Sequence, residues 1–153
     1  MYPLMLGLHS WIRWILLIGL IVLVVRSIAG FRKASPFTQL DDNLVLVVFW
    51  SLNIQFLIGL VIYVFFSPIT QMAFENMSEV MGNSSLRFFL VEHPFAMLLA
   101  LGAGHSGIAK AKRADDPKKK HGHILKGVGA CLFFVLAGIP WPFLPYGRAL
   151  FFL

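Results

Sequence analysis

The chain has 153 residues, of which 58% are hydrophobic and only 13% are charged. A soluble domain is typically about 45–50% apolar and about 25% charged, so the composition excludes that class and predicts an integral membrane protein with one domain, residues 1–153. Seven basic residues lie in positions 110–126, so the net charge of +6 indicates membrane orientation and gives no reason to expect a nucleic-acid partner.

Four apolar stretches predict membrane-spanning helices, because a helix needs about 20 mainly apolar residues to cross the hydrocarbon core. They cover residues 4–29, 43–66, 86–109 and 124–139. Asp41 and Asp42 precede the second stretch, where carboxylates suit the positive end of a helix dipole. No stretch alternates with the two-residue period of a barrel strand, so the expected fold is an all-α four-helix bundle.

The basic residues also predict the orientation of this bundle. Arg32 and Lys33 follow the first span, and the basic segment 110–126 follows the third, whereas loop 67–85 contains no Lys or Arg. Since cytoplasmic loops are enriched in Lys and Arg, we expect both termini and loop 67–85 on the outer side. Apolar side chains within that loop predict a short helix on the outer surface, and the aromatic tail 141–153 is expected at the outer interface.

Two histidines lie near the outer ends of two different spans. His9 is about one and a half turns inside the first span and His93 is about two turns inside the third, which at about 1.5 Å per residue gives similar depth. Ionisable side chains inside a membrane are costly and mark a functional site by default. Two neutral imidazoles that face each other from different helices suit a haem b, so His9 and His93 are predicted to be its axial metal ligands.

Charged residues beside these histidines complete the predicted cofactor site. Arg13 lies four residues after His9 on the same helical face, and it is suited to neutralise a haem propionate with two parallel hydrogen bonds. Arg87, six residues before His93, is suited to the same role. Glu92 is expected to pair with either arginine or to orient a ligand histidine as a hydrogen-bond acceptor.

The remaining histidines are expected to play no part in this site. His105 lies twelve residues after His93, on another face and near the inner end of the third span, and is expected to hydrogen-bond between helices. His121 and His123 follow a run of lysines and are expected in a solvated basic loop. The sequence therefore predicts one haem at most.

Two features near the predicted site concern the backbone and helix packing. Gln55 and Gly59 are four residues apart, so an amide and a close-packing position share one face of the second span. Pro94 has no N–H for the carbonyl of Leu90, and a break of this kind is tolerated in a membrane helix where a neighbouring group satisfies the backbone.

Two other interpretations stay open at this point. The chain is compatible with a non-enzymatic accessory or scaffold subunit in which the histidines make structural hydrogen bonds. It is also compatible with a non-haem metal or proton-handling site at His9, Glu92 and His93. The sequence contains no Walker-type glycine loop, no Gly-x-Ser-x-Gly and no His-Glu-x-x-His motif, so nothing indicates a nucleotide enzyme or a hydrolase.

Several motifs resemble a known family over nearly the whole chain. They are Leu8-His9-Ser10-x-x-Arg13-Trp14, Ser67-Pro68, Arg87-Phe88-Phe89-x-x-Glu92-His93, Ala109-Lys110-Ala111-Lys112-Arg113 and Ile139-Pro140-Trp141. This pattern resembles small bacterial four-helix membrane proteins labelled cytochrome b-like. The resemblance implies a haem b or electron-transfer association, with His9 and His93 as the matching histidines. We expect a multi-pass protein of the bacterial inner membrane. Its partners would be the lipid bilayer and either other membrane redox subunits or further copies of the chain.

The chain differs from true cytochrome b proteins in one respect. It lacks the two helices that each carry two histidines about thirteen or fourteen residues apart. Quinone-site chemistry is therefore not part of what the resemblance implies.

Overall fold

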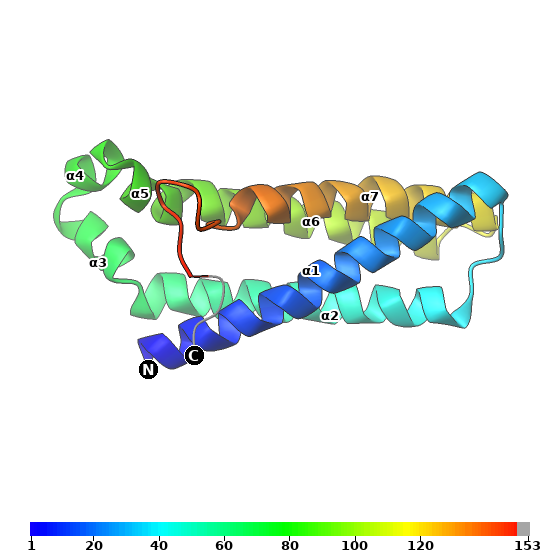
Figure 1. Cartoon of the computed structure of the whole chain (residues 1–153), viewed down its shortest axis with the longest axis horizontal. Coiled ribbons are helices and arrows are strands. Elements are labelled where there is room, and N and C mark those ends of the chain that lie inside the picture. Colours follow the sequence, from blue (N-terminus) through cyan, green and yellow to red (C-terminus); the bar gives the residue numbers. More distant parts are fainter. Residues whose placement is uncertain (150–153) are drawn as a thin grey trace.

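The computed structural model describes residues 1–149, and within this range the chain forms helices and turns without any strand (Figure 1). The long helices are α1 (Tyr2–Lys33), α2 (Gln39–Val61), α6 (His93–Lys112) and α7 (Pro117–Gly138). Helix α2 continues into a π-helical segment, Ile62–Phe66, and a second π-helical segment, Phe88–Glu92, leads into α6. Three short helices connect these segments: α3 (Pro68–Glu75), α4 (Met77–Gly82) and α5 (Ser84–Arg87).

Within the described residues, four helical stretches are long and apolar enough to cross a membrane, which confirms the all-α prediction with four candidate spans. They are Tyr2–Lys33, Gln39–Phe66, Ser84–Lys112 and Pro117–Gly138. Helix α1 crosses the others obliquely (Figure 1). It packs against α2 and α7, and α6 packs most extensively against α7, whereas α2 and α6 have the sparsest contact of these neighbouring pairs.

Helices α6 and α7 approach each other closely because glycines face each other between them. A Cβ atom added to Gly127 would overlap the backbone of Gly107, and one added to Gly107 would lie 3.0 Å from the carbonyl oxygen of His123. Small residues allow membrane helices to approach at backbone distance, where van der Waals packing holds them together.

The fourth helix begins earlier than the apolar pattern predicts. Asp116 accepts a hydrogen bond from the backbone N–H of Lys119 at 2.7 Å, and Pro117 occupies the first turn, which is where proline is favoured. The prediction of a solvated loop was wrong, because His121 and His123 both lie in α7, and His121 is buried. Its side chain is only 2% exposed and packs between Gly30 and the ring of Phe37.

Loop 67–85 is helical because three residues cap its short helices. The side chain of Ser67 accepts from the N–H of Thr70, that of Asn76 from Glu79, and that of Asn83 from Ser85 and Leu86. Several apolar side chains on these helices are exposed: Met72, Phe74, Met77 and Met81.

At the opposite end of the bundle, one buried carboxylate joins α1 to α2. Asp41 is 1% exposed and its Oδ1 accepts from the Nε of Arg26 at 2.7 Å. Its Oδ2 accepts from both the backbone N–H and the hydroxyl of Thr38, which forms a capping box at the start of α2. The predicted place of Asp41 in the first turn is confirmed.

Candidate functional site

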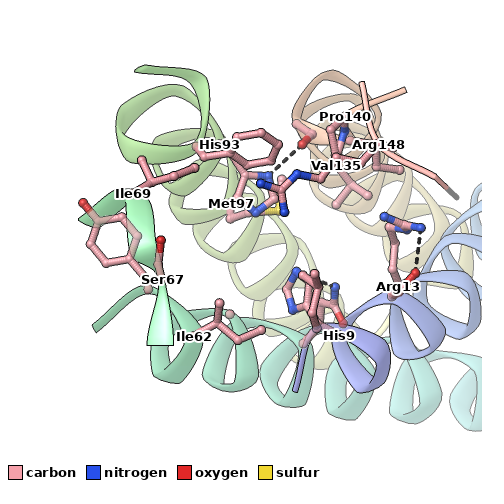
Figure 2. Close-up of a pocket in the computed structure, with 18 of the residues that line it drawn as sticks. His9, Arg13, Ile62, Ser67, Ile69, His93, Met97, Val135, Pro140 and Arg148 are labelled. Carbon is pink, nitrogen blue, oxygen red and sulfur yellow. Dashed lines mark hydrogen bonds between the residues drawn. The ribbon is translucent and has the colours of Figure 1, made fainter. Parts of the chain in front are cut away.

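Two neighbouring cavities lie between the helices, and both are lined by His9 and His93. The smaller, of about 110 Å³, also has Arg13, Met97 and Arg148 in its wall (Figure 2). The larger, of about 320 Å³, extends between α2 and α6. The lining residues common to both cavities are His9, Leu16, Gln55, Gly59, Tyr63, His93 and Met97.

The two predicted histidines face each other across this space. Their ring centres are 6.2 Å apart and their planes are inclined by 71°. The Nδ1 of His93 lies 2.7 Å from the carbonyl oxygen of Gly138. Since a carbonyl only accepts, Nδ1 carries the proton and the lone pair of a neutral ring is on Nε2. The structure records no hydrogen bond from the described residues to that Nε2.

His9 is held in a similar way by Gln55. The amide nitrogen of Gln55 lies 3.2 Å from Nε2 of His9, while Nδ1 of His9 is buried and has no partner in the described chain. The Oε1 atom of Gln55 is also buried and unpartnered there. A half-turn of the amide would let Oε1 accept from an Nε2–H and would leave the Nδ1 lone pair free. In either orientation, one ring nitrogen of His9 is held and the other is without a partner.

A glycine on a neighbouring helix lies beside each histidine. A Cβ added to Gly59 of α2 would lie 3.0 Å from Cε1 of His9. One added to Gly138 of α7 would overlap the end of Met97 and lie 3.7 Å from Nδ1 of His93. The prediction that Gln55 and Gly59 share one face is confirmed, since both contact His9. Larger residues at either glycine would fill the space around the histidines.

Two arginines give the smaller cavity a positive wall. Arg13 is 9% exposed and donates to the hydroxyl of Ser10 at 3.1 Å. Arg148 comes from the segment after α7, where its guanidinium lies 4.1 Å from the ring centre of Phe89 and donates to the hydroxyl of Tyr2 at 3.4 Å. No Asp or Glu lies among the described lining residues. The cavity is therefore suited to carboxylate groups, which guanidinium binds with paired hydrogen bonds.

Arg148 is a site residue that the predicted set omits. The tail was expected at the outer interface, and nothing in its local pattern indicates contact with the first helix. The sequence nevertheless contains one indication that Arg148 has a special role: it is the only charged residue after Lys126.

Arg87 and Glu92 lie apart from the cavities. They pair with each other, Nε to Oε1 at 2.9 Å, and their side chains are 41% and 45% exposed. Of the five predicted site residues, the structure therefore brings together His9, Arg13 and His93. Within residues 1–149, no three His, Cys, Asp or Glu side chains converge closely enough to hold a metal ion by themselves.

Other polar contacts hold the surrounding helices in place. The hydroxyl of Tyr63 donates to the carbonyl of Leu90 at 3.0 Å and so supplies the bond that Pro94 cannot. Asn53 lies 3.1 Å from Nε2 of His105, which confirms the predicted interhelical hydrogen bond of that histidine.

Comparison with known proteins assigns no family to this chain. No protein family model, no curated protein and no solved structure matches it. The resemblance to cytochrome b-like proteins therefore stays a prediction, and the geometry of the site carries the functional argument.

Proposed function

We propose that this chain is a multi-pass membrane protein that binds one haem b between His9 and His93. The observation that carries the proposal is the facing pair of imidazoles, each with one nitrogen held by the protein and one without a partner among the described residues. With metal–nitrogen bonds of about 2 Å, two imidazoles on opposite sides of one metal ion have ring centres roughly 6 Å apart. The separation in the structure is 6.2 Å.

The residues around the two histidines also fit the rest of a haem molecule. Gly138 and Gln55 would orient the two ligand rings, as hydrogen-bond partners of metal-bound histidines do. The two glycines leave room for the imidazole rings themselves, and the apolar residues of the larger cavity would exclude water. Arg13 and Arg148 would bind the carboxylates at the edge of the haem. When bound, haem supplies one-electron redox chemistry, with a potential tuned by its axial ligands and burial.

Orientation and partners follow as further parts of the proposal. The basic ends of α1, α6 and α7 support a cytoplasmic location for the Lys/Arg-rich end, with both termini on the outer side of a bacterial inner membrane. The protein would then carry electrons or serve as a small subunit of a respiratory assembly. Its redox partners would be other membrane subunits or further copies of the chain.

A reduced-minus-oxidised absorption spectrum tests the proposal. Protein purified after expression with ample haem is expected to show haem bands, and His9→Ala and His93→Ala are expected to lose or shift them. His105→Ala is the matched control, because His105 bonds to Asn53 and lines neither cavity. Absence of haem from the wild type, or equal spectra for all three variants, would overturn the assignment.

A further inference from the structure

Among the described residues, the seam between α2 and α6 is the most sparsely packed side of the bundle. These two helices have sparse contact, and the larger cavity lies between them. Its polar residues, His9, Gln55, Tyr63 and His93, belong also to the smaller cavity. The residues found only in the larger cavity are apolar: Leu52, Phe56, Leu60, Pro94 and Leu98. The space therefore changes from polar to apolar along the seam.

The apolar part of this seam reaches the lipid-facing surface. Leu60 and Leu98 line the cavity and are also 46% and 54% exposed. Both lie within helical stretches that are long and apolar enough to cross a membrane. Side chains exposed on such stretches face acyl chains rather than water. The mouth of the larger cavity thus opens sideways into the bilayer.

The end of the bundle beside the histidines is covered by the segment after α7. The ring of Tyr146 stacks on Phe88 with centres 3.8 Å apart, and the hydroxyl of Ser85 donates to the carbonyl of Pro145. The guanidinium of Arg148 reaches Tyr2 on α1. In Figure 1 this segment passes from the end of α7 toward α5 and then toward the start of α1. A ligand entering from this end would have to displace it.

We infer that the α2–α6 seam is a lateral portal through which the histidine site takes its ligand from the lipid phase. The ligand class is a flat, apolar molecule with carboxylates on one edge. Its apolar edge occupies the seam, and its carboxylates lie at Arg13 and Arg148. This inference rests on the proposed function, because the molecule that best fits the description is haem b.

The rate of haem uptake from vesicles tests the portal. Apoprotein in lipid vesicles receives haem dissolved in the same bilayer, and the growth of the haem band is followed. Leu98→Trp narrows the mouth and is expected to load about tenfold more slowly than Leu99→Trp, which corresponds to a barrier increase of about 1.4 kcal/mol. Leu99 is the matched control, since it is 38% exposed on the same helix but lines neither cavity.

Two results would overturn the portal. One is equal loading rates for Leu98→Trp and Leu99→Trp. The other is faster loading in Tyr146→Ala, which loosens the C-terminal segment, because that result would place the route at the end of the bundle.

A second readout works without haem. In a Cys131→Ala background, Met97→Cys places a thiol in the wall of both cavities. A lipid-soluble maleimide is expected to label it faster than a charged, membrane-impermeant one, and Leu98→Trp is expected to slow the labelling where Leu99→Trp does not. Equal labelling in the two tryptophan variants refutes the portal. If labelling behaves as expected and the wild type binds no haem, only the proposed function is refuted.

Discussion

The hydrogen bond from Tyr63 to the carbonyl of Leu90 yields a quantitative prediction. It joins the end of the second span to the start of the third, beside the histidine site, at a donor–acceptor distance of 3.0 Å. Leu90 is 8% exposed, so its carbonyl has little access to other partners. Pro94, four residues later, has no N–H to offer it. The stability effect of Tyr63→Phe should therefore depend on the residue at position 94.

The magnitude follows from the environment of the carbonyl. Interhelical hydrogen bonds in membranes average about 0.6 kcal/mol and reach about 1.7. Leaving a buried acceptor unpaired costs about 1–3 kcal/mol. We therefore expect Tyr63→Phe to lower the free energy of unfolding by about 1–2 kcal/mol. With Pro94→Ala an N–H returns within reach of Leu90, so the same change should cost less than about 0.5 kcal/mol in that background.

The assay is a double-mutant cycle in detergent. Free energies of unfolding are measured by denaturant titration for the wild type, both single variants and the double variant, all at equal haem content. The expected coupling between the two positions is about 1 kcal/mol. If Tyr63→Phe has the same cost in both backgrounds, the hydroxyl does not replace the missing N–H and the reasoning is wrong.

Three further substitutions test the packing of the bundle. Asp41→Asn weakens the bond to Arg26 and should lower the free energy of unfolding, measured by thermal unfolding, by about 1–3 kcal/mol. Unchanged stability would show that this bond does not stabilise the packing of α1 against α2. Gly127→Leu should cause aggregation on size-exclusion chromatography because its side chain meets the α6 backbone, whereas Gly129→Leu, where a Cβ meets nothing within 4 Å, should stay monodisperse. If His9 binds haem as proposed, Gly59→Val should reduce haem content about tenfold by crowding the His9 ring, and normal haem content would refute this role of Gly59.

The depth of the histidine pair could be predicted from sequence because helix rise and the apolar boundaries determine it. His9 and His93 lie at comparable distances from the starts of their spans, and the structure places them face to face. The direction of nearby side chains was harder to predict. Arg87 directly precedes the π-helical segment Phe88–Glu92 and Glu92 is its last residue, and the wider turn of this segment changes the direction of side chains relative to an α-helix. They pair with each other on the exposed surface.

Arg148 and His121 could not be placed because their positions depend on tertiary contacts. The path of the C-terminal segment depends on contacts such as the stacking of Tyr146 on Phe88, and no local propensity encodes it. His121 follows three lysines, and reasoning from a run of charged residues predicts solvent exposure for all four residues. Once the segment is helical, Lys118 and Lys119 face outward and His121 turns toward α1.

Carbon monoxide binding to the reduced protein tests the central claim, ligation by two histidines, most directly. If His9 and His93 fill both axial positions, the wild type should show little change in its absorption spectrum when carbon monoxide is added. His93→Gly should keep haem on His9 and bind carbon monoxide fully at the opened position. Complete binding by the wild type, or the absence of haem from both proteins, would contradict the claim.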